Sequence, residues 1–310
     1  MKSGSRRRSA SVRGGFILVS VLLSVTMLLT TATAFAWFAR TEMKRAEMNR
    51  FILQTRSAAE IACSLIGAKI AADKNGYDSV REPLYSAASV NLELGDFKVS
   101  AAIRPLDDKI PVRGIFLPDG ITVRKEYEEG WKNVWEYLKR EELGTIVLDF
   151  MDKDDKQKLG GSERPDNIDR LISDLSELKQ LPEADDGLIW GTARIPGGFD
   201  RYFTVYGREK ININVANPEV IAILDDDIDL AQAKSLAAAR IVSPIKNLND
   251  LKKLPGFPDA VVTKLANIFG FESTYFRVDM TVGTEAKRER NYRIILQRSG
   301  SSCKIVRWEE

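Results

Sequence analysis

Six carboxylates gather in one short stretch of the chain and could bind a metal ion: Asp149, Asp152, Asp154, Asp155, Glu163 and Asp166. Hard carboxylate oxygens on a tight loop are what calcium prefers, and an extracytoplasmic protein meets enough of that ion. The expected Ca²⁺ ligands are Asp152, Asp154, Asp155 and Glu163. The loop is not an EF-hand, because lysines intrude and its sixth position lacks glycine. The alternative is a solvated loop whose aspartates cap the following helix.

The other chemistry-bearing residues argue against catalysis. Histidine is absent from all 310 residues, which excludes Ser-His-Asp triads, Cys-His pairs and histidine zinc sites. The run Asp225-Asp226-Asp227 has no identifiable cleft or partner acid for hydrolysis, so we interpret it as an exposed helix start. We therefore expect the chain not to be an enzyme.

The only two cysteines, Cys63 and Cys303, are too far apart in sequence for a CxxC redox or metal motif. They could still meet in the fold as a disulfide if the domain lies outside the cytoplasm. Two free, partly buried thiols are the alternative.

The N-terminus carries the strongest signal for a class of protein. The chain is uncharged from Phe16 to Ala39, which is long enough for a helix to cross the ~30 Å hydrocarbon core of a membrane. Basic residues precede this run: Lys2, Arg6, Arg7, Arg8 and Arg13. By the positive-inside rule the N-terminus should stay cytoplasmic and the rest should lie outside.

Three interpretations fit this segment. It could be a plain signal anchor, or a secretory signal peptide cut after Ala36, since Ala34-Phe35-Ala36 has the small-x-small pattern. The third is a prepilin leader, a short basic stretch that ends at Gly15 and is followed by Phe16 and the apolar run. Cleavage between Gly15 and Phe16 would leave the whole apolar helix in the mature protein.

The following residues favour the leader. Apolar and small residues recur at helical spacing from Met48 to Ile70, and Asn75-Gly76 is a good stop signal. A single helix from Phe16 to about Lys74 would be roughly 90 Å long, with an apolar first half and an amphipathic second half. A cut at Ala36 would separate these halves.

Beyond this helix the hydrophobic period changes to that of strands. Residues 90–94 and 97–103 alternate around Gly95-Asp96, which predicts a hairpin, and strands are expected at 275–282, 291–298 and 303–308. Between these strands, residues 131–142, 167–182 and 217–270 show helical spacing. We predict an α+β fold: a long N-terminal pilin helix packed on an antiparallel sheet, with a large all-α insert of SAM-like or helix-hairpin-helix-like type.

These patterns divide the chain as follows: leader 1–15, membrane half of the helix 16–39, periplasmic half 40–75, first strands 76–112, helical insert 113–272 and last strands 273–310. A weak repeat between 175–182 and 248–255 suggests two small bundles in the insert, at about 113–210 and 211–272.

Residues 248–271 are similar to a helix-hairpin-helix element, which can bind DNA backbone. The hairpin lacks the usual Gly-x-Gly turn, and Asp250 and Asp259 stand beside its lysines. We therefore expect a structural or protein-contact bundle and no nucleic acid.

Taken together, these features resemble the K-type minor pseudopilin of the bacterial type II secretion system, also called general secretion pathway protein K. The resemblance covers nearly the whole chain. Its motifs are the Gly15-Phe16 junction, residues 148–155 with Gly160-Gly161-Ser162-Glu163, Ile211-Asn212-Ile213-Asn214-Val215-Ala216 and residues 273–278. The sequence departs from the family at Phe150, where tryptophan is usual, and in the loosely similar segment 107–112.

The resemblance implies a place and a role. Members are single-pass inner-membrane proteins with a cytoplasmic N-terminus and a periplasmic body, and Phe16 would be N-methylated after a prepilin peptidase cuts. They are thought to start pseudopilus assembly at its tip with the minor pseudopilins I and J, next to the major pseudopilin and with H as a further candidate neighbour. The filament helps to export folded proteins across the outer membrane. The family's helical domain has also been associated with calcium.

Position five after the cut supports the tip. Ordinary pilins resemble one another in carrying glutamate there, which offsets the N-terminal amine of the previously added subunit inside the lipid. Ser20 occupies this position here, so the chain has nothing to offer a predecessor. The alternative is an ordinary helix-packing or lipid-facing serine.

Two other functions stay open at this point: a minor pilin of a type IV pilus or related filament, and a secreted helix-hairpin-helix binding protein released after Ala36. The mature N-terminus separates the secreted protein, which would begin at Trp37, from the other two, which would begin at Phe16.

Overall fold

The computed structural model describes residues 10–85, 90–254, 257–285 and 288–310, with side chains from residue 16 onward. The chain divides into two compact units, Met1–Ser57 and Ala58–Glu310. A single helix supplies the first unit and continues into the second.

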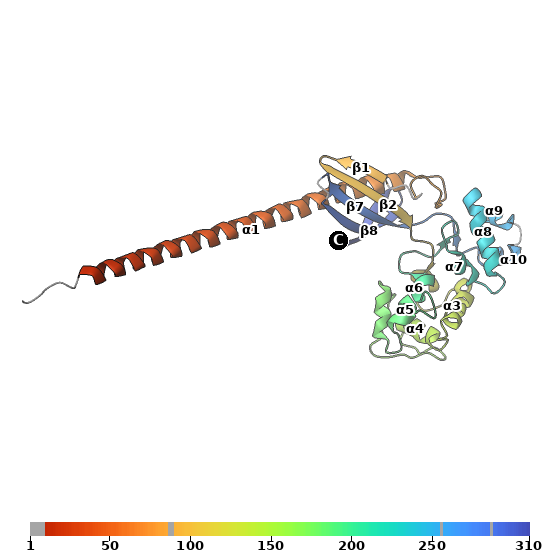
Figure 1. Cartoon of the computed structure of the whole chain (residues 1–310). Coiled ribbons are helices and arrows are strands. Elements are labelled where there is room, and N and C mark those ends of the chain that lie inside the picture. Colours follow the sequence, from red (N-terminus) through yellow and green to blue (C-terminus); the bar gives the residue numbers. More distant parts are fainter. Residues whose placement is uncertain (1–9, 86–89, 255–256, 286–287) are drawn as a thin grey trace, which may run out of the picture. The chain divides into compact units, whose positions relative to one another are not determined.

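This helix, α1, is one uninterrupted element of 63 residues over Ala10–Ala72 (Figure 1). It begins earlier than the expected start at Phe16 and ends close to the expected stop, where Gly76 adopts a positive φ of 82°. Hydroxyls in its apolar half donate to carbonyls of the preceding turn, as Thr30 Oγ1 does to Met27 at 2.9 Å. These bonds satisfy the side-chain hydroxyls within the helix itself.

One antiparallel sheet unites strands from both ends of the chain, as the sequence predicts. Its order is β1-β2-β7-β8-β9. The strands are β1 (Val90–Leu94), β2 (Phe97–Pro105), β7 (Tyr275–Thr284), β8 (Glu289–Ser299) and β9 (Ser302–Glu309). Gly95 takes a positive φ of 59° in the predicted two-residue turn, which pairs Leu94 with Phe97. The pairing of β2 with β7 joins the first two strands of this sheet to the three strands from the C-terminal end of the chain.

The last turns of α1 cover one face of this sheet. Ala58, Ala59 and Ala62 are buried there, and such small side chains allow the helix to approach closely. They pack in one cluster with Val99, Ala101, Ile103, Val278, Met280, Ile294 and Leu296 from the strands. The long helix and antiparallel sheet of the predicted α+β fold are confirmed.

The chain between β2 and β7 forms the helical insert, which packs several helices around short strand pairs. Its helices are α2 (Val112–Ile115), α3 (Lys125–Tyr137), α4 (Leu143–Met151), η1 (Leu175–Gln180), α5 (Asp186–Trp190), α6 (Phe199–Tyr202), α7 (Pro218–Ala222), α8 (Leu230–Val242), α9 (Leu248–Lys252) and α10 (Asp259–Lys264). Two parallel pairs join distant segments: β3 (Ile110–Pro111) with β4 (Phe203–Thr204), and β5 (Ile211–Asn212) with β6 (Phe269–Gly270).

Aromatic residues fill the centre of the insert. Trp131 packs edge-on against Phe203, with ring centroids 5.2 Å apart, and Phe203 stacks on Phe199 at 4.1 Å. Buried side chains from both expected halves, such as Trp135 and Val262, belong to one cluster. Leu178 on η1 and Leu251 on α9 occupy equivalent positions in the weak sequence repeat, and both are buried.

Two predicted helices of the insert differ from the structure. The helix expected at 131–142 runs over Lys125–Tyr137 instead, because Lys139 takes a positive φ of 55° and ends it. Residues 167–182 contain only the short 3₁₀ helix η1. Asp169, with φ 46°, interrupts the first half of that stretch.

Asp107 connects the start of the insert to the sheet through hydrogen bonds. Its Oδ2 accepts N–H bonds from Thr274 and Tyr275, both at 2.9 Å, although only 3% of the residue is exposed. Burial raises the pKa of this carboxyl from 3.8 to about 7, helped by Asp78 and Asp108 and opposed by the two N–H bonds.

This shift predicts a pH dependence of stability. Between pH 4 and 7 the folded chain retains a proton on Asp107 that the unfolded chain has lost, so this group's contribution is greatest at low pH and falls as pH rises. The slope is at most about 1.4 kcal/mol per pH unit. Urea unfolding of the full chain in detergent at pH 5, 6, 7 and 8 should show a flatter profile for Asp107→Asn than for the parent. An unchanged profile, equal to that of the exposed variant Asp227→Asn, would contradict the assignment.

Candidate functional site

The apolar half of α1 is the candidate membrane and assembly segment. Among the residues that the structure describes, α1 is the one helix long and apolar enough to cross a membrane. Its large side chains point outward, with Phe16 76%, Leu18 69% and Phe35 72% exposed. An uncharged helix with apolar side chains on all faces is suited to lipid.

The predicted cleavage junction lies in this helix. The backbone of both Gly15 and Phe16 is helical, within α1. The leader before residue 10 and the side chains before Phe16 lie outside the described residues. At position five, Ser20 Oγ donates to the Ile17 carbonyl at 2.9 Å, so its hydroxyl is satisfied by its own helix.

The acidic loop follows the C-terminal end of α4. The carboxylates of Asp149 and Asp152 are fully buried there, and Lys158 lies between them. The Lys158 ammonium is 3.6 Å from Asp149 Oδ1 and forms an ion pair with Asp152. Asn167 connects the loop further by donating to Glu163 Oε1 at 2.9 Å and to the Asp149 carbonyl at 3.2 Å.

Several oxygens of this loop have no hydrogen-bond donor although they are shielded from solvent. They are Oδ1 of Asp152, Oδ1 of Asp154 and Oε2 of Glu163, whereas Asp152 Oδ2 forms the ion pair with Lys158. Burial raises the pKa of Glu163, and Asp149, Asp169 and Asp154 add to the effect. The loop thus concentrates negative charge with unused oxygens, which is the donor set that calcium requires.

The structure separates one of the four expected ligands from a carboxylate that was not among them. Asp155 is exposed, whereas Asp149, which was not among the four, is buried beside Asp152. A side chain at Gly161 would collide with the Asp149 carboxylate, so the Gly160-Gly161 turn fits closely around it. The buried carboxylates of the loop are therefore those of Asp149 and Asp152, whereas Asp155 faces solvent.

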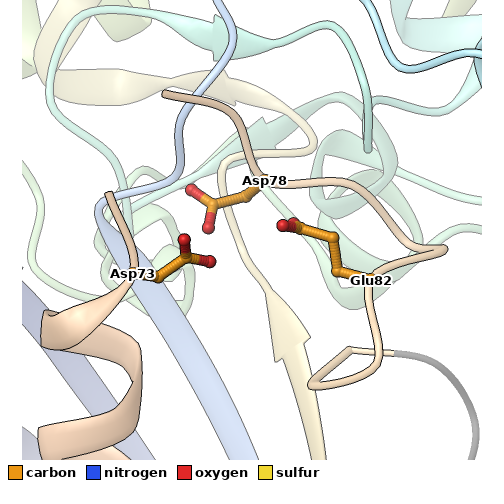
Figure 2. Close-up of side chains that lie close together, drawn as sticks. All are labelled: Asp73, Asp78 and Glu82. Carbon is orange, nitrogen blue, oxygen red and sulfur yellow. The ribbon is translucent and has the colours of Figure 1, made fainter. Parts of the chain in front are cut away.

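A different acidic group has its oxygens closest together. Carboxylate oxygens of Asp73, Asp78 and Glu82 lie within 4.8 Å of one another in the segment after α1 (Figure 2). Asp78 is paired with the guanidinium of Arg298, and Glu82 accepts the Ser79 N–H at 2.8 Å. Asp78, the buried member of this group, is therefore already paired with an internal cation, and we interpret the group as structural.

Arg298 and Asp78 are the centre of a junction network that also contains Ser273 and Asn212. Arg298 donates to the Ser273 carbonyl at 2.6 Å, and Asp78 accepts the Ser273 N–H. Asn212 Nδ2 donates to the Asp78 carbonyl at 3.0 Å and to Ser273 Oγ at 2.8 Å. The junction network joins the loop after α1, the last strands and the insert.

The Ile-Asn-Ile-Asn motif is explained by this network and its continuation. Asn214 is buried, donates to the Ile245 carbonyl and accepts the Ile245 N–H, both at 2.8 Å. Arg240 donates to the carbonyl of Ile213 at 2.5 Å, and burial lowers its pKa to about 10. Alternating asparagines therefore satisfy buried backbone, while the isoleucines between them fill the core.

The helix-hairpin-helix-like segment comprises α9 and α10, and its turn at 255–256 lies outside the described residues. Lys264 forms ion pairs with Glu129 and, at 2.6 Å, with Asp225. Asp225 is only 1% exposed, so the expectation that the whole run Asp225–Asp227 is exposed was wrong for its first member. Because carboxylates already neutralise Lys264, this lysine is a poor phosphate ligand.

The chain is similar to known proteins in two comparisons, while no curated protein matches it significantly. Residues 211–270 match the family model described as type II secretion system (T2SS), protein K. A chain in the crystal structure of the GspK–GspI–GspJ complex from the enterotoxigenic Escherichia coli type 2 secretion system matches with a TM-score of 0.57. That match has 13% identity and covers 87% of this chain and 98% of that chain.

The two comparisons complement each other. The family match spans the Ile-Asn-Ile-Asn motif and α7–α10, which all belong to the insert. The structural match extends the likeness to the helix and sheet. Together they confirm the resemblance of this chain to the K-type minor pseudopilins of type II secretion systems.

Proposed function

We propose that the chain is a minor pseudopilin at the tip of a type II secretion pseudopilus, where it starts assembly and supports export of folded proteins. One observation carries the proposal: a single helix with an exposed apolar half continues into the core of a pilin-like sheet, and a large insert interrupts that sheet between β2 and β7. The helix would hold the subunit in the inner membrane before assembly, with a cytoplasmic N-terminus and a periplasmic body.

The partners follow from the same proposal. The solved complex unites GspK with GspI and GspJ, which supports minor pseudopilins I and J as neighbours of this chain. The major pseudopilin, with H as a further candidate, would follow below, and a prepilin peptidase would act first. The paired lysine and the acids of the hairpin support a protein-contact role for the insert rather than nucleic-acid binding.

Two features support the tip position. The insert adds bulk that is most easily accommodated where no subunit lies above it. Ser20 offers a hydroxyl that is already bonded to Ile17 in place of the carboxylate that would neutralise a predecessor's amine. A first subunit has no predecessor, so the missing carboxylate costs it nothing.

The mature N-terminus tests the proposal directly. Mass spectrometry of the chain purified from its membrane should find N-methylated Phe16 as the first residue. A first residue of Trp37 would instead identify a released soluble domain and refute the proposal. An uncut chain that begins at or near Met1 would identify a plain anchor.

A carboxylate at position five should misplace the subunit. Ser20→Glu would offer the charge partner that ordinary pilins provide, so we expect the variant to enter the shaft as well as the tip and secretion to fall. Cross-linking of sheared filaments and a secretion assay measure both effects. The matched control is Ser24→Glu, one helical turn further along, whose carboxylate carries the same insertion cost of about 2.5–3.5 kcal/mol. Unchanged assembly and secretion with Ser20→Glu would count against the tip argument.

We also propose that the acidic loop holds a structural calcium ion. Asp152, Asp154 and Glu163 each have a buried oxygen without a donor, and Asp149 lies beside them. The ion would replace the Lys158 ammonium as the balancing charge and would fix the loop after α4.

Calcium should therefore stabilise the full chain in detergent. At a free concentration about 100 times the Kd the gain is about 2.7 kcal/mol, which thermal unfolding with calcium and with EDTA would detect. Asp152→Asn should remove the response, whereas Asp227→Asn, at an exposed aspartate elsewhere in the insert, should retain it. Equal melting of the parent chain with and without calcium would dismiss the site.

A further inference from the structure

The two cysteines meet in the layer between helix and sheet. Cys63 lies on α1, is 1% exposed and belongs to the buried cluster, while Cys303 on β9 packs against the same cluster. Gly67 follows Cys63 by one helical turn on the same face. A Cβ placed at Gly67 would lie 3.2 Å from the Cβ of Cys303, so the Cys303 side chain stands directly against this turn of α1.

Gly67 is what allows this approach. Residues four apart on a helix have Cβ atoms about 5–6 Å apart, and a disulfide requires a Cβ–Cβ distance of about 3.5–4.5 Å. Cys303 therefore lies over the face of α1 that Cys63 and Gly67 share, and the two thiols, which are free in this structure, occupy the same part of the layer between helix and sheet. Any larger side chain at position 67 would push β9 away.

The surroundings of the two thiols also shift their pKa values. Burial, and to a lesser degree the neighbouring Cys303, raise the pKa of Cys63 to about 11. Burial likewise raises the pKa of Cys303, but Arg298, its partner across β8 and β9, acts in the opposite direction. Cys303 is also the more exposed of the two. It is therefore the thiol that meets an oxidant first.

We propose that Cys63 and Cys303 form a disulfide in the mature protein. The Cys303 thiol attacks an external disulfide, protein-borne or glutathione, which gives a mixed disulfide and releases one thiol. The Cys63 thiol then attacks the Cys303 sulfur and releases the second thiol. The two cysteines lose two electrons in total, and the external disulfide gains them as it becomes two thiols. This proposal rests on the proposed periplasmic location of the body, where such oxidants persist.

The bond would tie α1 to the edge of the sheet. Strand β9 has a single neighbour, β8, in the five-stranded sheet. A link from β9 to α1 would close nearly the whole body into one loop and so restrict its unfolded chain. Tension along the helix, which the proposed role implies, would then pass to the sheet through a covalent bond and not through packing alone.

The first experiment tests the geometry on the purified full chain in detergent. After equilibration with oxidised glutathione, denaturation and alkylation, we expect the number of modified thiols to fall from two to none, and a peptide that links Cys63 to Cys303 to appear. Cys63→Ala and Cys303→Ala should each retain one sulfur that is alkylated or carries glutathione, without an internal link. Two alkylatable thiols in the treated parent chain would overturn the proposal.

The second experiment separates this proposal from the proposed function. Cells that produce the full chain are quenched with an alkylating reagent before lysis, and the thiols are counted again. No free thiol supports the disulfide in the mature protein. Two free thiols in cells, from a chain that oxidises readily after purification, would overturn the proposal that the disulfide forms in the cell. That result would place the body in a reducing compartment, although the two cysteines would still be close enough to bond. Failure of oxidation in the purified chain, by contrast, would leave the proposed function untouched.

Discussion

Replacing Arg298 by methionine should lower the free energy of unfolding of the body by about 3–5 kcal/mol, the usual cost of removing one partner from a buried ion pair. Asp78 is fully buried, and the Arg298 side chain is 13% exposed. Methionine retains most of the apolar stem but removes the guanidinium, which lies over the Phe276 ring. The Asp78 carboxylate would then remain in the core without a cation.

The remaining contacts of Asp78 cannot replace the guanidinium. The Ser273 N–H and the Tyr85 hydroxyl, at 2.9 Å, donate to its carboxylate but carry no charge. The Ser273 carbonyl loses its donor at the same time, because Arg298 also serves that group. Loss of the ion pair thus leaves one buried carboxylate without a counter-charge and one carbonyl without its Arg298 donor, in the place where the insert is attached to the sheet.

Urea unfolding of the full chain in detergent measures the effect. Arg293→Met is the matched control, since Arg293 lies on the same strand and pairs with Asp279 at an exposed position, where such pairs contribute about 0–1 kcal/mol. The double variant Asp78→Asn/Arg298→Met should recover part of the loss, because asparagine carries no charge and its one amide oxygen can still accept the Ser273 N–H. If Arg298→Met were as stable as Arg293→Met, the junction network would have no stabilising role.

The elements with a regular hydrophobic period could be predicted from the sequence. The alternation at Val90, Leu92 and Leu94 with Gly95 in the turn places the first hairpin, because a period of two is what a sheet with one buried face requires. The long helix was equally clear, since its residues lack proline and its alanines recur at helical spacing. Such signals are local and need no knowledge of what the element packs against.

The insert was harder to predict because its elements are short and depend on distant contacts. The ion pair of Asp78 and Arg298 joins residues 220 apart, and the parallel pairs β3·β4 and β5·β6 contain only two residues per strand. No hydrophobic period marks such elements. Lys139 is an ordinary residue for a helix, yet its positive φ ends α3.

The candidate sites show the same limit. The composition of the acidic loop indicated a cation, but the choice between Asp149 and Asp155 depends on which side of the α4 terminus faces inward. The order of carboxylates in the sequence does not show which of them points toward the core. Likewise, the sequence named Cys63 and Cys303 as a candidate pair, whereas their placement on one face required the packing of β9 against Gly67.

Substitution of Gly15 by leucine should abolish maturation of the chain. The proposed cut follows Gly15, and a peptidase that accepts glycine there must accommodate a backbone without a side chain, so an added isobutyl group should exclude the bond from its active site. Leucine leaves the charge and the insertion of the helix unchanged. Mass spectrometry should find the parent chain beginning at Phe16 and the variant chain uncut. Gly14→Leu, one residue further from the cut, is the control and should be processed.

An uncut chain should also fail to leave the membrane. Five basic residues, Lys2, Arg6, Arg7, Arg8 and Arg13, precede the apolar run, and in the proposed orientation they lie on its cytoplasmic side. Drawing the helix out of the bilayer into a filament would pull these charges through hydrocarbon, at about 2.5–3.5 kcal/mol each by insertion scales. Cleavage removes all five and leaves a single amine, so the cut converts a fixed anchor into a segment that can be extracted. A Gly15→Leu chain that still entered filaments would break this argument, because the leader's charge would then present no barrier to assembly.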